Sequence, residues 1–143
     1  MRRLVLLLVS VLVLAACGGG GGGTSDTAKI THVWTSFFSA KTPVSQKPAM
    51  LQDGSRFAST ITALAKNPLA SNLSSKVSTV TLQGSSKAKV VFSVYLGSTA
   101  VLKDQTGYAS KQNGNWVVDY ASLCKLIALE GSTPAACKAS THS

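Results

Sequence analysis

The stretch AKVVFSVYL, residues 88–96, decides the fold because apolar side chains occupy every second position in it. A period of two is typical of a β-strand that buries one face and leaves the other outside the core. The buried face of this predicted strand is formed by Ala88, Val90, Phe92, Val94 and Leu96.

Further strands are predicted on both sides of this stretch. They cover residues 76–82, 99–102, 106–111 and 115–120, and the piece at 99–102 is the weakest of them. The last two are joined through Asn113-Gly114, a pair that tolerates positive φ and therefore indicates a tight hairpin. The strands follow one another through short turns, so the sheet is predicted to be antiparallel.

Helical spacing precedes the strands. A first helix is predicted from a cap at Ser25 or Asp26 to about residue 38, and its apolar face carries Ile30, Val33, Trp34, Phe37 and Phe38.

Two more helices are predicted before the sheet and one after it. The second covers 45–53 and ends at Gly54 in a left-handed conformation, and the third starts near Phe57 and ends at Asn67, before Pro68. The last covers 121–130 and ends at Gly131.

This order predicts an α+β domain. Three N-terminal helices pack on one face of a curved antiparallel sheet of about four strands, and a short C-terminal helix follows. The globular domain is predicted over residues 26–131, with a flexible polar tail over 132–143.

The amino-terminal segment predicts export. Arg2 and Arg3 precede an apolar run at 4–14 that is too short to span a bilayer, as in a secretory signal. The sequence Leu-Ala-Ala-Cys at 14–17 resembles the lipobox of bacterial lipoproteins. That resemblance implies a signal peptide over 1–16, cleavage between Ala16 and Cys17, acylation of Cys17, and a glycine-rich tether over 17–25. An ordinary secreted protein, with Cys17 present by chance, is the alternative.

The chain is basic, with 14 Lys and Arg against 5 Asp and Glu and a net charge of +9. This charge suits an anionic lipid headgroup or an acidic envelope polymer, although dispersed lysines also simply solubilise a protein. The lysines form no basic stripe with interleaved aromatic residues, so nucleic acid is not a predicted partner.

Cys124 and Cys137 remain once Cys17 is assigned to lipid. They either form a disulfide in an oxidising compartment, or Cys124 is buried and Cys137 is free. No cofactor or metal is predicted, because His32 and His142 lack ligand spacing.

The larger aromatic residues have two interpretations. Such side chains usually fill the interior, but they can also line a cavity for an apolar ligand. The candidate lining residues are Trp34, Phe37, Phe57, Phe92 and Trp116. Among the acids and histidines, only Asp119 and His32 are expected to be able to face inward, and a single acid without a placed partner does not predict a catalytic residue.

Six short segments resemble the low-molecular-weight secreted antigens of mycobacteria and related actinobacteria. They are WTSFF (34–38), LQDGSRF (51–57), LAKNPLA (64–70), DQTG (104–107), NGNWVV (113–118) and LCKL (123–126). The resemblance implies the cone of the nuclear transport factor two-like (cystatin-like) fold and an exported antigen without an assigned reaction.

The function expected is that of a non-catalytic surface antigen or binding module. It is held at the extracytoplasmic face of the cell membrane through acylated Cys17, and it binds an apolar small ligand or an envelope partner. A cationic module that docks on anionic envelope polymers or a membrane partner is the alternative, and a dehydratase- or isomerase-like cavity enzyme is a third.

Replacing Cys17 by Ala tests the anchor. The variant is expected to move from the membrane fraction to the culture fluid, or to remain unprocessed, because it lacks the thiol that receives lipid. Fractionation and mass spectrometry of the protein from its native host measure this. An unchanged variant in the membrane fraction would contradict acylation at Cys17.

Overall fold

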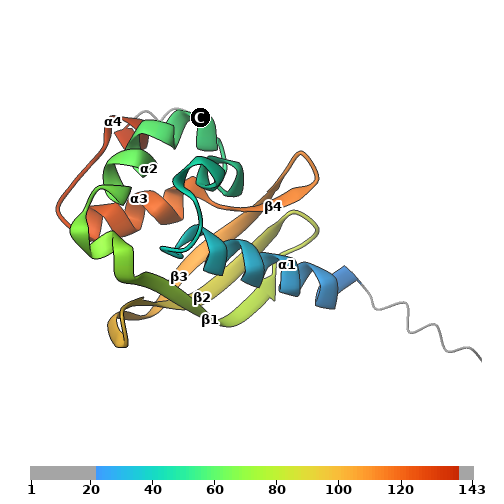
Figure 1. Ribbon diagram of the computed structural model, residues 1–143. Helices are drawn as coiled ribbons and strands as arrows, with labels where there is room; N and C mark the ends of the chain where they lie inside the picture. Colours follow the sequence, from blue (N-terminus) through green and yellow to red (C-terminus); the bar gives the residue numbers. More distant parts are fainter. Residues whose placement is uncertain (1–21, 139–143) are drawn as a thin grey trace, which may run out of the picture.

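The computed structural model describes residues 22–138. The predicted signal peptide at 1–16, Cys17 and the first part of the tether lie outside the described residues. The predicted α+β arrangement is confirmed, since N-terminal helices pack on a curled, four-stranded antiparallel half-barrel and short helices end the chain (Figure 1).

The sheet has the strand order β1-β2-β3-β4, and every neighbouring pair is antiparallel. The strands are β1 (Leu73–Leu82), β2 (Lys87–Leu96), β3 (Thr99–Gln112) and β4 (Asn115–Val118). The two predicted pieces at 99–102 and 106–111 are one strand, β3. Its register against β2 is irregular near Val94, and Asp104 has φ 49°. This irregularity interrupts the alternation of side chains, which is why the sequence suggested a break.

The alternation predicted for β2 is confirmed. Ala88, Val90, Phe92 and Val94 are buried, and Leu96 is half-buried. The residues between them point to the outer face of the sheet, so one face of the half-barrel forms the core wall.

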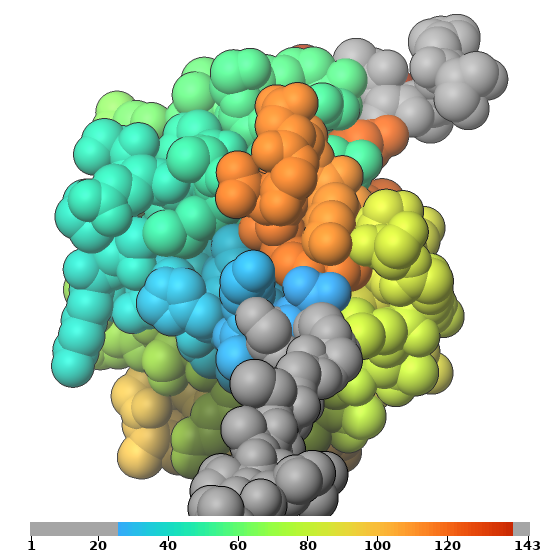
Figure 2. Space-filling model, turned by 90° about the vertical axis from the view of Figure 1, so that its right-hand side faces the viewer, coloured from blue at the N-terminus to red at the C-terminus, as the bar shows by residue number. Residues whose placement is uncertain are grey.

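Helix α1 (Gly22–Phe37) supplies the opposite wall. All five apolar residues of its predicted stripe are buried. The helix begins at Gly22, so the cap predicted at Ser25 or Asp26 is wrong. Near its start, Asp26 Oδ2 lies 3.9 Å from Lys111 Nζ, and Figure 2 shows the blue part of α1, which follows residue 25, beside the orange β3–β4 hairpin.

The second predicted helix is a 3-10 helix, η1 (Val44–Met50), which is shorter than predicted. The left-handed residue is Asp53, with φ 51°, and Gly54 is not. Gly54 is needed for another reason: a Cβ there would overlap the carbonyl of Pro48.

The third predicted helix is divided into η2 (Gly54–Phe57) and α2 (Ala58–Ala65), so it ends before Asn67. Asn67 instead caps η3 (Pro68–Asn72), because its Oδ1 accepts a hydrogen bond of 3.0 Å from the Leu69 N–H. Residues expected to be a simple connection therefore form a defined helical turn.

The carboxyl-terminal part begins at the predicted hairpin, where Asn113 and Gly114 have φ 53° and 79° as expected. Strand β4 ends two residues earlier than predicted because Asp119 caps α3 (Tyr120–Leu129). The residues predicted as a flexible tail include a further helix, α4 (Ala135–Lys138), and a disulfide links it to α3.

The indole of Trp34 joins α1 to the centre of the sheet. It is fully buried, and its ring centroid lies 4.4 Å from that of Phe92 on β2. A Cβ at Gly107 on β3 would overlap the Trp34 ring and would lie 3.2 Å from Phe92 Cε1. The indole therefore rests directly on sheet backbone, at a position where only glycine fits.

Replacing Gly107 by Ala is expected to lower the free energy of unfolding by about 1–3 kcal/mol, because the added methyl group overpacks the core. Urea denaturation measures the change. In a Trp34→Phe background the smaller ring leaves room for the methyl group, so the same substitution is expected to cost less. Equal costs in the two backgrounds would exclude a clash with the indole as the cause.

A candidate apolar ligand pocket

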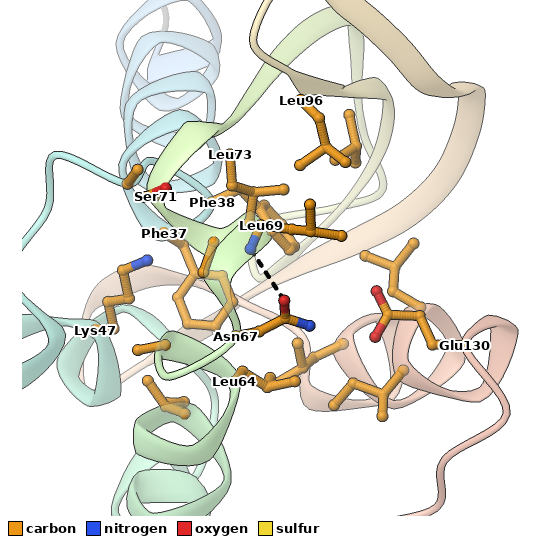
Figure 3. A pocket seen from close by; sticks show the side chains of 18 of the residues that line it. Phe37, Phe38, Lys47, Leu64, Asn67, Leu69, Ser71, Leu73, Leu96 and Glu130 are labelled. Atoms are coloured by element: carbon orange, nitrogen blue, oxygen red, sulfur yellow. Dashed lines mark hydrogen bonds between the residues drawn. The ribbon is translucent and has the colours of Figure 1, made fainter.

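A pocket of about 700 Å³ lies at the end of the half-barrel where α1 finishes (Figure 3). Its volume is in the range of small-molecule sites. Helices and strands far apart in the sequence supply its mainly aliphatic wall. This wall includes Phe37 at the end of α1 and Phe38 after it, Leu64 on α2, Leu73, Val94, Leu96 and Leu102 on the strands, and Leu123, Leu126 and Ile127 on α3.

The rim of the pocket is unusually apolar. Within residues 22–138, the exposed large hydrophobic side chains are Leu69, Val101 and Leu129, which are 60%, 46% and 58% exposed. All three line this pocket. Apolar side chains gathered at one opening, rather than scattered singly, are typical of a binding site.

The Cys124–Cys137 disulfide supports one wall. It joins α3, which carries Leu123, Leu126 and Ile127, to α4, with a Cα–Cα distance of 5.6 Å. A loop closed over a separation of 13 residues contributes about 3 kcal/mol by the chain-entropy model. Of the two fates considered for these cysteines, the structure has the disulfide, which is typical of proteins outside the cytoplasm.

Few charged side chains reach the pocket. They are Lys47 from η1, Lys66 after α2, and Glu130 after α3. Lys47 is half-buried, and this burial lowers the pKa of its ammonium group. Figure 3 shows Lys47 and Glu130 on opposite sides of the pocket, with Asn67 between them.

The five predicted cavity residues do not all lie at the pocket. Phe37 lines the pocket, whereas Trp34, Phe57, Phe92 and Trp116 are packed in the core and do not line it. Leu64, Leu69 and Leu126 carry the pocket instead. No pattern in the sequence marks Leu69 as a pocket residue, because it falls in a segment interpreted as a connection.

The predicted acid–base candidates are not assembled in the pocket. His32 is exposed on α1. Asp119 is occupied in the α3 cap, where it accepts hydrogen bonds from the Ala121 N–H at 2.9 Å and the Ser110 hydroxyl at 3.2 Å.

Over residues 22–138, no three His, Cys, Asp or Glu side chains are grouped as metal ligands. In the same range, no helix has both the length and the apolar character needed to cross a bilayer.

The fold and the pocket define a small, disulfide-containing α+β domain whose helices and half-barrel enclose an apolar site. A family model described as "Low molecular weight antigen MTB12, C-terminal domain" matches residues 24–134, which is more than half of the chain, so the chain belongs to this family. The predicted resemblance to low-molecular-weight antigens is thereby confirmed. No curated protein matches the chain.

Proposed function

We propose that this protein is an exported, non-catalytic binding protein that is anchored to the cell membrane through acylated Cys17 and holds an apolar small ligand in the pocket. The observation that carries the proposal is the pocket itself. Its wall is mainly aliphatic. The exposed large hydrophobic side chains within residues 22–138, which are Leu69, Val101 and Leu129, lie at its rim.

Export is supported from two directions. The disulfide between α3 and α4 suits an oxidising compartment, and the family consists of antigens by its description. The membrane anchor is supported by the lipobox-like sequence at 14–17, which lies next to a signal-like apolar run.

Binding without chemistry is supported by the composition of the pocket wall. Its ionisable side chains are Lys47, Lys66 and Glu130, and Figure 3 separates Lys47 from Glu130 across the pocket. Concerted general acid–base catalysis by a pair of side chains requires that both lie close to the same reacting centre. The cap role of Asp119 and the exposure of His32 place the other candidates elsewhere.

A neutral apolar dye, N-phenylnaphthylamine, tests the pocket directly. We expect its fluorescence to rise and saturate as the protein is added, since the wall excludes water from the bound dye. Replacing Ala65 by Trp fills the pocket and is expected to weaken dye binding by about tenfold or more.

Ala63 provides the matched control, because it lies on the same helix, is exposed, and does not line the pocket. Ala63→Trp is expected to leave dye binding unchanged. The proposal is wrong if the dye does not bind saturably, or if the two tryptophan variants bind it as tightly as the unchanged protein.

A second candidate function is supported by the outer face of the sheet. Lys76, Lys87 and Lys89 project from this face, and they make it cationic. Lys76 Nζ lies 5.3 Å from the ring centroid of Tyr95, and Lys87 Nζ lies 5.2 Å from that of Tyr108. A curved cationic face with tyrosines suits an anionic membrane surface.

Vesicles of phosphatidylglycerol mixed with phosphatidylcholine test this candidate by co-sedimentation. The double variant Lys76→Gln/Lys87→Gln is expected to bind several-fold more weakly, and salt is expected to weaken binding of the unchanged protein. The exposed pair Lys29 and Lys125, changed to Gln together, is the charge-matched control. Equal losses in both double variants would indicate net charge alone and contradict a specific face.

A further inference from the structure

The charged groups of the pocket differ in how far they are removed from water. Lys66 and Glu130 are exposed, whereas Lys47 is half-buried against the apolar wall. The ion pair found within residues 22–138 joins Lys111 to Asp26, so Lys47 has no carboxylate partner in that range. A partly desolvated ammonium group without a counter-ion is therefore part of an otherwise aliphatic site.

We propose that the pocket binds a single-chain amphiphile with an anionic head, so that the head pairs with Lys47 Nζ and the acyl chain lies on the aliphatic wall. This inference rests on the proposed binding function and specifies the chemical class of its ligand.

The burial of Lys47 supports this pairing. Removing an ammonium group from water is unfavourable, and the lowered pKa of Lys47 reflects that cost. An anionic head restores a favourable interaction with the charged form, and in a water-poor site this interaction is stronger than at an open surface. Lys66 is hydrated already and gains less from an anion.

Lys47 and Glu130 together orient the ligand, and half-buried Lys47 contributes more because Glu130 is exposed to solvent. Figure 3 shows Glu130 on the side of the pocket away from Lys47. A carboxylate there repels an anionic head, so the head belongs at η1 and the chain extends toward α3 and the strand ends. The apolar rim residues Val101 and Leu129 then cover the chain rather than the head.

The size of the pocket sets the chain length. A methylene group takes up about the volume of one water molecule in the liquid, about 30 Å³. An acyl chain of about 12–18 carbons therefore occupies about 360–540 Å³, which leaves part of the 700 Å³ pocket for the head. Each methylene buried is expected to tighten binding by about fourfold.

Dodecanoate and dodecanol separate the head from the chain, because they share one acyl length and differ in charge. Displacement of N-phenylnaphthylamine, below micelle-forming concentrations, measures both affinities. We expect dodecanoate to bind about tenfold more tightly than dodecanol. Lys47→Met keeps most of the aliphatic stem and is expected to remove this preference, so that dodecanoate and dodecanol bind with similar affinity.

Lys29→Met is the matched control, since Lys29 is exposed in the middle of α1 and does not line the pocket, and it is expected to preserve the preference. Lauroyl lysophosphatidylglycerol is compared with dodecanoate: tighter binding of the first assigns the site to a lipid headgroup, and tighter binding of the second assigns it to a free fatty acid.

Two results would overturn the inference and leave the proposed function standing. One is equal binding of dodecanoate and dodecanol by the unchanged protein. The other is an equal loss of both ligands in Lys47→Met. If the protein binds neither ligand nor the dye, the proposed function fails as well.

Discussion

The packing of one indole against bare sheet backbone is the constraint on which the domain depends. Trp34 is wholly buried, and the space for its ring exists because residue 107 is glycine. Phe38 and Phe92 pack against the same ring, with centroids at 5.4 and 4.4 Å. Helix α1 is thereby fixed across the sheet by contacts that no smaller side chain could make at once.

This arrangement also explains why the interior is solid at one end and hollow at the other. The large aromatic side chains on α1 and β2 meet around Trp34 and fill that region. Past Phe37 the helix ends, and the remaining space is bounded by aliphatic side chains from α2, η3, α3 and the strand ends. These aliphatic side chains line this space but do not fill it, so a pocket remains.

Much of the fold was predictable because the repeating patterns reflect burial on one face. The period of two in β2 and the helical stripe of α1 both place buried residues correctly. The local chemistry of short segments was harder to predict. Asp53 rather than Gly54 adopts positive φ. Gly54 is instead needed because its backbone lies against Pro48, and a contact of this kind is not visible in a linear pattern.

The candidate site was less predictable because it, too, depends on contacts between segments that lie far apart in the sequence. Aromatic residues were the natural choice for a cavity wall. Of the five predicted, Phe37 lines the pocket, and the other four fill the hydrophobic core. The residues that line the pocket, such as Leu69 and Leu126, come from segments that meet only after folding. Partial desolvation of Lys47 likewise arises from its neighbours in space, and nothing in its sequence context marks it.

The direction of α1 has a consequence for the amino-terminal anchor that we propose. The pocket opens beside Phe37 and Phe38, at the far end of a 16-residue helix, which is about 24 Å from the start of that helix. The attachment that we propose at Cys17 precedes Gly22 in the sequence, so the length of α1 separates the start of the described domain from the pocket. A ligand would then enter and leave the pocket at a distance from the amino-terminal end of α1.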